Sequence, residues 1–275
     1  LMARTVGAGL NGPMAAFCRL ARENARRHSL SHVFRDFCEL AALAISNATD
    51  RVNFDKREGR YMQIVRAYER DEVQRFSQML AHVVEELEAG MTDCMGALFM
   101  ALELGDAGKG QFFTPFAVSS LMARLTLGDV RGHVERAGFV SFNEPAVGAG
   151  GMVIAAAEVM RESGLNYQQA MHVVATDNDA TACHMAYIQF SLLHIPAVVI
   201  HGNGLNPAQS WDEWLTPAHV LGGWSARLQG EGRVRAAELL MPAVSPVPAN
   251  VPAIASPREA VAAIEQRREA QMALF

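Results

Sequence analysis

The chain has 275 residues, of which 50% are apolar and 19% are charged, so most of it can bury a core. Its length suits one large domain or two modest ones. The formal net charge of −5 argues against a strongly basic nucleic-acid binder, although a local basic face is compatible with an acidic total.

Four cysteines are scattered along the chain, at positions 18, 38, 94 and 183, without a Cys-x-x-Cys pair. We therefore expect neither a zinc site nor a disulfide framework, and a reducing cytoplasm is the natural compartment. No apolar run is long enough to span a bilayer, and the N-terminus lacks the charged-then-apolar pattern of a signal peptide. The expected protein is cytoplasmic, without a metal and without a membrane partner.

The first hundred residues have the apolar spacing of helices. Residues 11–48 are predicted to be helical, with Ser31 as a candidate N-cap. Two more helices are predicted over 61–68 and 73–87, and Gly90 ends the second of them in the C′ role. Nothing in this helical module singles out chemistry. Its arginines are more typical of a solvated helix face than of a DNA contact.

A last helix of this module is expected between Thr92, a candidate N-cap, and Gly105. A glycine-containing joint follows. Thr114 and Pro115 then have the pattern of an N-cap and a first helical residue, for a helix that runs to about Leu127. The free N–H groups of its first turn would form an anion site.

From Gly138 the apolar period changes. Three short strands are predicted over 139–142, 171–176 and 197–201, with a helix after each of the first two. Alternation of strands and helices is typical of a parallel sheet. No clear apolar strand is predicted over 206–228.

A glycine loop follows the first of these strands. Glu144 stands four places before Gly148, and Gly150 completes a Gly-x-Gly pair. The glycines let the backbone approach a ligand with no Cβ in the way, and the ligand would lie in the crevice beyond the strand ends. A carboxylate at this position is what an S-adenosylmethionine pocket needs.

Two motifs carry a family resemblance. The run Gln111-Phe112-Phe113-Thr114-Pro115, followed by Glu144-Pro145-Ala146-Val147-Gly148-Ala149-Gly150-Gly151-Met152, resembles the adenine-N6 DNA methylases. More narrowly, it is similar to the methylation subunit of type I restriction–modification systems. The resemblance covers roughly residues 10–205.

The resemblance implies an α/β fold. It predicts an N-terminal helical domain over 1–105 and a Rossmann-like, S-adenosylmethionine-dependent methyltransferase domain over 106–230 with a reduced parallel sheet. A proline-rich linker and a C-terminal helix are predicted over 231–275.

The same resemblance assigns residues to the S-adenosylmethionine pocket. The lining of its methionine end would be Phe113, Thr114 and Pro115. The loop beneath the cofactor would be Glu144, Pro145, Gly148 and Gly150. Asp177 would accept hydrogen bonds from the ribose hydroxyls, and Asn178 would lie beside the adenine ring. Asn203 occupies the place of an aspartate near the adenine amino group.

Each motif alone has a simpler interpretation. A nicotinamide-binding loop would have Gly-x-Gly-x-x-Gly, but Val153 stands at its last position. Asp177 alone is more typical of a helix cap, and Thr114-Pro115 alone is an ordinary helix start. The joint occurrence of the motifs in this order favours the cofactor pocket.

The catalytic motif of this family is Asn or Asp, two prolines and an aromatic residue, which stacks on the flipped base. This motif is not intact here. Asn206-Pro207 lies too close to Asn203 and lacks the aromatic residue. The degenerate candidates are Thr216, Pro217 and His219, which stand where the motif is expected.

Two functions therefore remain open. The first is site-specific adenine-N6 methylation of DNA, with a partner subunit that supplies sequence recognition. The alternative is a catalytically inactive relative that acts as a cofactor-binding regulatory, accessory or assembly protein and forms homo-oligomers. The intact pocket motifs favour the first, and the degenerate catalytic motif favours the second.

Overall fold

The computed structural model describes residues 12–104 and 113–229. The predicted glycine joint, Gln111, Phe112, the proline-rich linker and the C-terminal helix lie outside these residues, as does the predicted domain boundary at 105. No helix among the described residues is long and apolar enough to cross a membrane.

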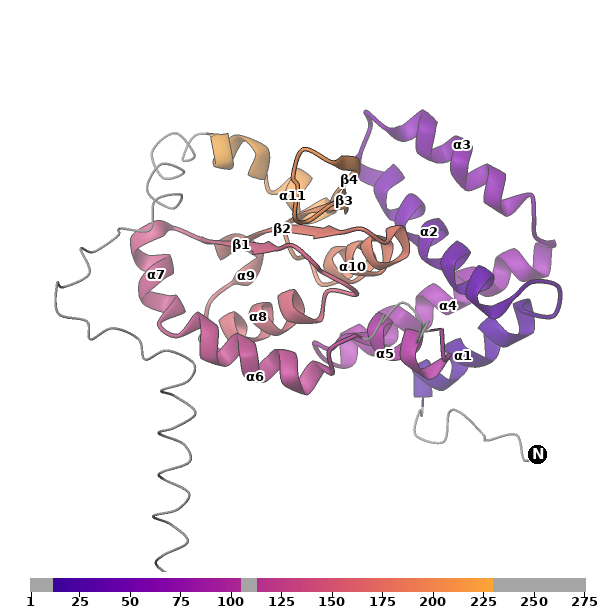
Figure 1. Cartoon of the computed structure of the whole chain (residues 1–275), viewed down its shortest axis with the longest axis horizontal. Coiled ribbons are helices and arrows are strands. Elements are labelled where there is room, and N and C mark those ends of the chain that lie inside the picture. The colour runs from indigo at the N-terminus through magenta and orange to yellow at the C-terminus, as the bar shows by residue number, and fades with distance from the viewer. Residues whose placement is uncertain (1–11, 105–112, 230–275) are drawn as a thin grey trace, which may run out of the picture. The chain divides into compact units, whose positions relative to one another are not determined.

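The N-terminal part is helical, as predicted (Figure 1). Its helices are α1 (Gly12–Asn24), α2 (Leu30–Thr49), α3 (Phe54–Val65), α4 (Arg70–Ala89) and α5 (Cys94–Ala101). The predicted helix over 11–48 is two helices, because Ser29 rather than Ser31 caps α2 by accepting a hydrogen bond from the His32 N–H at 3.2 Å. Asp93 rather than Thr92 caps α5, through the Gly96 N–H at 2.8 Å. Gly90 follows α4 in an extended conformation and not in the left-handed one that the C′ role requires.

The second part alternates helices and strands. Its elements are α6 (Phe116–Leu127), α7 (Val130–Ala137), β1 (Val140–Glu144), α8 (Gly151–Glu162), α9 (Tyr167–Ala170), β2 (Met171–Asp177), α10 (Ala180–Leu192), β3 (Ala197–Gly202), β4 (Ser210–Leu215) and α11 (Pro217–Leu221). The described strands form one sheet in the order β1-β2-β3-β4, and the first three are parallel. The fold is therefore α/β with a reduced, mostly parallel sheet, as predicted.

The sheet register decides where the polar strand ends meet. Glu144 pairs with Ala175, and Asp177 pairs with His201, so the ends of β1 and β2 lie at the same edge of the sheet. The strands β1, β2 and β3 lie side by side in the order of the chain. Right-handed crossovers between them therefore place α8 and α10 on the same face of the sheet (Figure 1).

β4 corrects the expectation that no strand follows β3. It runs antiparallel to β3, and Trp214, which is 3% exposed, pairs with Val199. Apart from the half-buried Leu215, the other side chains of this strand are polar or exposed, so its pattern lacks the apolar run of the inner strands. The strand is held by its backbone pairing with β3 and by the burial of Trp214.

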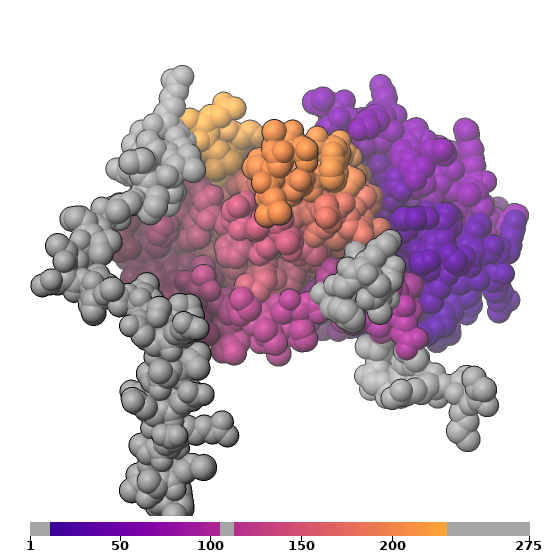
Figure 2. Space-filling model, in the orientation of Figure 1, coloured from indigo at the N-terminus to yellow at the C-terminus, as the bar shows by residue number. Residues whose placement is uncertain are grey.

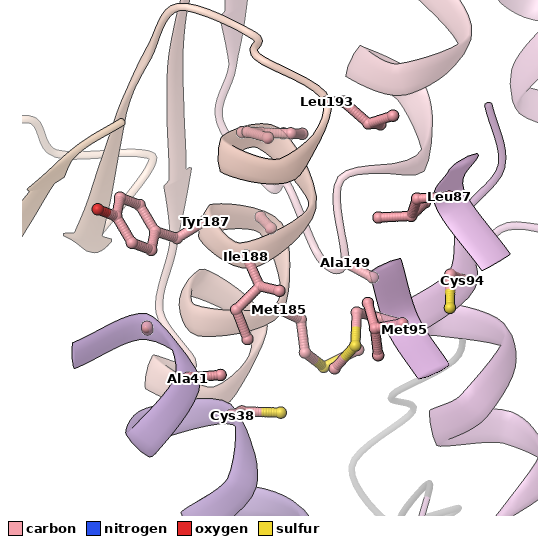
Figure 3. Packing of buried hydrophobic residues seen from close by; sticks show 14 of the residues in the cluster. Cys38, Ala41, Leu87, Cys94, Met95, Ala149, Met185, Tyr187, Ile188 and Leu193 are labelled. Atoms are coloured by element: carbon pink, nitrogen blue, oxygen red, sulfur yellow. The ribbon is translucent and has the colours of Figure 1, made fainter. Parts of the chain in front are cut away.

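The core joins the two parts of the described chain. α10 is buried on all sides, because it packs against the sheet as well as against α2 and α5. Figure 3 shows Met185 and Ile188 of α10 among Cys38 and Ala41 of α2 and Met95 of α5. The surface of the N-terminal helices accordingly meets that of the sheet region in Figure 2.

A buried arginine adds a polar link between the parts. Arg57 of α3 is 3% exposed and donates a hydrogen bond to the Glu213 carbonyl of β4 at 2.7 Å. Its guanidinium lies 4.2 Å from the centre of the Trp214 ring and pairs with Asp50. The apolar and polar contacts together place the N-terminal helices in the same compact unit as the sheet, which extends to Leu228.

Candidate functional site

A cavity of about 510 Å³ lies beyond the carboxyl ends of β1 and β2. This is where ligands bind in open α/β sheets. Six of the ten residues predicted for the cofactor pocket line it: Phe113, Thr114, Glu144, Gly148, Asp177 and Asn178. Side chains that are distant in sequence therefore face one space.

The loop over 145–150 forms the floor of this cavity and depends on its glycines. Gly148 has φ +56° and Gly150 has φ +103°, in the left-handed region that favours glycine. A Cβ at Gly148 would lie 3.0 Å from the Phe113 ring, and a Cβ at Gly150 would lie 2.6 Å from the Phe190 ring. Both positions therefore require glycine for conformation as well as for space.

Asp177 ties this loop to the end of β2. Its Oδ2 accepts a hydrogen bond from the Gly148 N–H at 2.8 Å, and its Oδ1 accepts one from the Asp179 N–H at 3.0 Å. Asp179 caps α10 through the N–H groups of Thr181 and Ala182, so Asp177 does not act as the helix cap. Each carboxylate oxygen of Asp177 keeps a further acceptor position for a ligand.

Glu144 presents a second carboxylate to the cavity. Its Oε1 accepts a hydrogen bond from the Ala146 N–H at 3.2 Å. Burial raises the pKa of Glu144, and the nearby negative charge of Asp177 raises it further. Two carboxylates that repel each other favour a ligand that donates hydrogen bonds, such as hydroxyl groups, or one that carries positive charge.

A family comparison agrees with this geometry. Residues 99–220 match the family model of the N-6 DNA methylases. This segment is similar to that family. The matched methylase segment contains the glycine loop, both carboxylates and all four described strands.

A solved structure gives a weaker likeness. It is a protein from Listeria monocytogenes assigned as a class I S-adenosylmethionine-dependent methyltransferase, with a TM-score of 0.40 and 14% sequence identity. The similarity covers 72% of this chain and 55% of that protein, so the chain spans little more than half of its length. No curated protein matches the chain.

The other four residues predicted for the cofactor pocket do not line the cavity. Pro115 occupies the N-cap position of α6, and Gly150 that of α8. Pro145 packs under the turn after β3, where a Cβ at Gly204 would lie 2.0 Å from the Pro145 carbonyl oxygen. Asn203 uses its side chain within that same turn, donating to Gln209 Oε1 at 2.8 Å and accepting from the Leu205 N–H at 3.0 Å.

The candidates for the degenerate methylase motif lie at the other end of the sheet. Because β4 runs antiparallel to β3, it returns the chain from Gly202 to Ala197. Thr216 Oγ1 accepts a hydrogen bond from the Ala197 N–H at 2.9 Å. Ala197 begins β3, so Thr216 lies one strand length, roughly 16 Å, from the end of the sheet that borders the cavity. Pro217 begins α11 beside it. The geometry therefore does not bring Thr216 or Pro217 to the cavity.

His219 shares this distant position. Its Nδ1 lies 2.9 Å from Nε2 of His172, which stands at the start of β2, and its Nε2 lies 2.9 Å from Ser225 Oγ. Burial lowers the pKa of His219. This histidine pair closes the amino end of the sheet and does not face the ligand cavity.

One cavity residue comes from outside the methylase segment and was not predicted. Asp93 precedes α5, is 6% exposed, and lines the cavity beside the end of the glycine loop. Gln189 Nε2 donates to Asp93 Oδ1 at 2.9 Å and to the Ala149 carbonyl at 2.7 Å. One buried amide thus joins the helical part to the glycine loop. Only the helix-cap pattern of Asp93 is visible in the sequence.

Proposed function

We propose that the chain binds S-adenosylmethionine in this cavity and serves in adenine-N6 methylation of DNA. The observation that carries the proposal is the glycine loop between two carboxylates, Glu144 and Asp177, at the ends of adjacent parallel strands. A family match over 99–220 supports the same reading.

The residues of the cavity suit the cofactor. The free acceptor positions of Asp177 would take the ribose hydroxyls, and Asn178 would contact the adenine edge. The left-handed glycines keep side chains out of the space above the loop. Phe113, against Gly148, and Thr114 would enclose the methionine end.

S-adenosylmethionine would supply the methyl group. The cofactor would give its methyl group to the adenine N6, and the proton that N6 loses would pass to solvent. The neutral thioether product would be released. This chain's residues would position the sulfonium and exclude water from it.

The described residues do not place the catalytic motif of the adenine-N6 methylases at the cavity. No Asn/Asp-Pro-Pro-aromatic sequence occurs in the chain, and Thr216 lies at the opposite end of the sheet. We therefore infer that a partner subunit completes the base site and reads the DNA sequence, as in a restriction–modification complex in the cytoplasm.

Two surface features support a partner. Among the described residues, β1 pairs with β2 alone, so its other edge is open to a further strand. In addition, α6 exposes a stripe of apolar residues at helical spacing, which are Val118, Leu121, Met122 and Leu125. Met122 also lines the cavity, so this apolar stripe reaches the rim of the site.

The test is methyl transfer from labelled S-adenosylmethionine to DNA by the full chain, alone and with candidate specificity subunits. We expect label in adenine only in the presence of a partner. The second candidate function, an inactive cofactor-binding accessory protein or homo-oligomer, is favoured by the displaced Thr216 segment. Tight cofactor binding without transfer to any DNA, with every partner present, would select it.

A further inference from the structure

Asp93 is a buried carboxylate that no cation in the described part of the chain neutralises. Its side chain has hydrogen bonds from the Gly96 N–H at 2.8 Å and from Gln189 Nε2 at 2.9 Å, and both end on Oδ1. Among the described residues no lysine, arginine or histidine pairs with it. Burial raises the pKa of Asp93, and the hydrogen bonds from Gln189 and Gly96 offset only part of this effect. Oδ2 is therefore a free acceptor.

Ser119 of α6 lies beside this oxygen. It is 0% exposed, and its Oγ has no hydrogen-bond partner within residues 12–104 and 113–229. A Cβ built on Gly151 would lie 3.2 Å from Asp93 Oδ2 and 3.5 Å from Ser119 Oγ. Both oxygens thus face one small space at the start of α8, and all three residues line the cavity. A buried carboxylate oxygen and a buried hydroxyl without a partner around one space can both accept hydrogen bonds from a donor placed there.

Helix capping does not explain this arrangement. Asp129 caps α7 through the Gly132 N–H at 2.9 Å, in the same Asp-x-x-Gly pattern with which Asp93 caps α5. Asp129 is exposed, as caps usually are, whereas Asp93 is buried against the cavity. A cap uses one oxygen and tolerates solvent. The second oxygen and the burial of Asp93 thus remain unexplained by capping.

We propose that Asp93 Oδ2 and Ser119 Oγ bind the α-ammonium group of the amino-acid end of the cofactor. The inference rests on the proposed function and extends it to a residue outside the matched methylase segment. An ammonium group donates three hydrogen bonds and carries the positive charge that would pair with the Asp93 carboxylate. Through Gln189, which also holds the Ala149 carbonyl, the bound ammonium would be coupled to the glycine loop.

The test compares two ligands and two variants of the full chain. S-adenosylhomocysteine carries the amino-acid end, whereas 5′-methylthioadenosine lacks it. By calorimetry, we expect Asp93→Asn to bind S-adenosylhomocysteine at least tenfold more weakly and to bind 5′-methylthioadenosine within twofold of wild type. Asparagine retains the cap. Asp129→Asn, the matched control, should change neither affinity.

Two further measurements do not depend on how Asp93→Asn folds. Wild-type protein should bind the S-adenosylhomocysteine analogue without an α-amino group at least tenfold more weakly than S-adenosylhomocysteine itself. Ser119→Ala should weaken only the ligand that carries the amino group, by about threefold. If wild-type protein binds S-adenosylhomocysteine and its analogue without an α-amino group equally well, Asp93 does not bind the ammonium group.

The outcomes separate this inference from the proposed function. Wild type could bind S-adenosylhomocysteine and 5′-methylthioadenosine while a folded Asp93→Asn loses no affinity for either. In that case the proposed ammonium site is wrong, and the proposed cofactor pocket is retained. If wild type binds neither ligand at millimolar concentration, the proposed function fails and the ammonium site fails with it.

Discussion

The Gly148 N–H donates a hydrogen bond to Asp177 Oδ2 at 2.8 Å and so joins the loop after β1 to the end of β2. The Val147 N–H reinforces this link by donating to the Thr176 carbonyl at 2.8 Å. The carboxylate that we expect to hold the ribose therefore also sets the shape of the loop beneath it. Loop geometry and ligand affinity should change together when Asp177 is altered.

Asp177→Ala should lose both functions of this carboxylate. A hydrogen bond to a charged group contributes about 1.5–3 kcal/mol, so we expect the free energy of unfolding to fall by an amount in this range. Affinity for S-adenosylmethionine should fall at least tenfold. Chemical denaturation and calorimetry measure the two effects. A variant with unchanged affinity would remove Asp177 from the pocket.

Gly148→Ala should combine backbone strain with a steric conflict. A left-handed alanine costs about 1–2 kcal/mol, and its Cβ would lie 3.0 Å from the Phe113 ring. We expect lost stability together with at least tenfold weaker cofactor binding.

The control for this variant is Gly138→Ala. Gly138 has φ +81°, and its Cβ would meet nothing within 4 Å, so it carries the strain alone. Its stability should fall by about 1–2 kcal/mol with no change in affinity. If both variants bind the cofactor equally well, the contact between Gly148 and Phe113 does not shape the site.

Arg57→Met tests the polar link between the helical part and β4. It would leave Asp50, which is 7% exposed, without its buried partner. Loss of one member of a buried pair typically costs about 3–5 kcal/mol, and we expect a loss of that order in the free energy of unfolding.

A matched exposed pair serves as control for Arg57. Arg60 of α3 pairs with Glu39 of α2 at 2.5 Å, and the Arg60 side chain is 44% exposed, so Arg60→Met should cost less than about 1 kcal/mol. Similar losses in the two variants would show that the buried pair does not hold the parts together.

His184 predicts an acid-sensitive core. Burial lowers its pKa to about 4, whereas an unfolded histidine has about 6.5. Between these values the unfolded chain binds the proton that the folded chain refuses, so stability falls as pH decreases from 6.5 to 4. The shift corresponds to about 3 kcal/mol at pH 4.

The measurement is urea denaturation of wild type and His184→Gln at several pH values. The variant should lose less stability than wild type on acidification through this range, whatever its stability at pH 7. Parallel pH profiles for the two proteins would contradict the buried neutral histidine.

Features that depend on local pattern could be predicted from the sequence. The three parallel strands have short apolar runs, and the glycine loop has positions that only glycine can fill. β4 was missed because its single buried side chain, Trp214, leaves no apolar alternation. Its antiparallel direction also explains why Thr216 follows β3 in the chain yet lies far from the cavity.

Asp93 shows a different limit. Its local pattern is the same as that of Asp129, and only the packing of α5 against α10 makes one a buried cavity residue and the other an exposed cap. Capping is encoded within four residues, whereas burial depends on contacts with Gln189, far along the chain. Sequence patterns therefore predict the local geometry of a helix cap, but they do not predict whether the capping carboxylate is buried in a cavity.

The most direct test of the account is a calorimetric titration of the full chain with S-adenosylmethionine. We predict micromolar binding that is lost in Asp177→Ala and Gly148→Ala and retained in Gly138→Ala. An absence of binding at millimolar cofactor, or equal binding by all four proteins, would contradict the assignment of this cavity as the cofactor pocket.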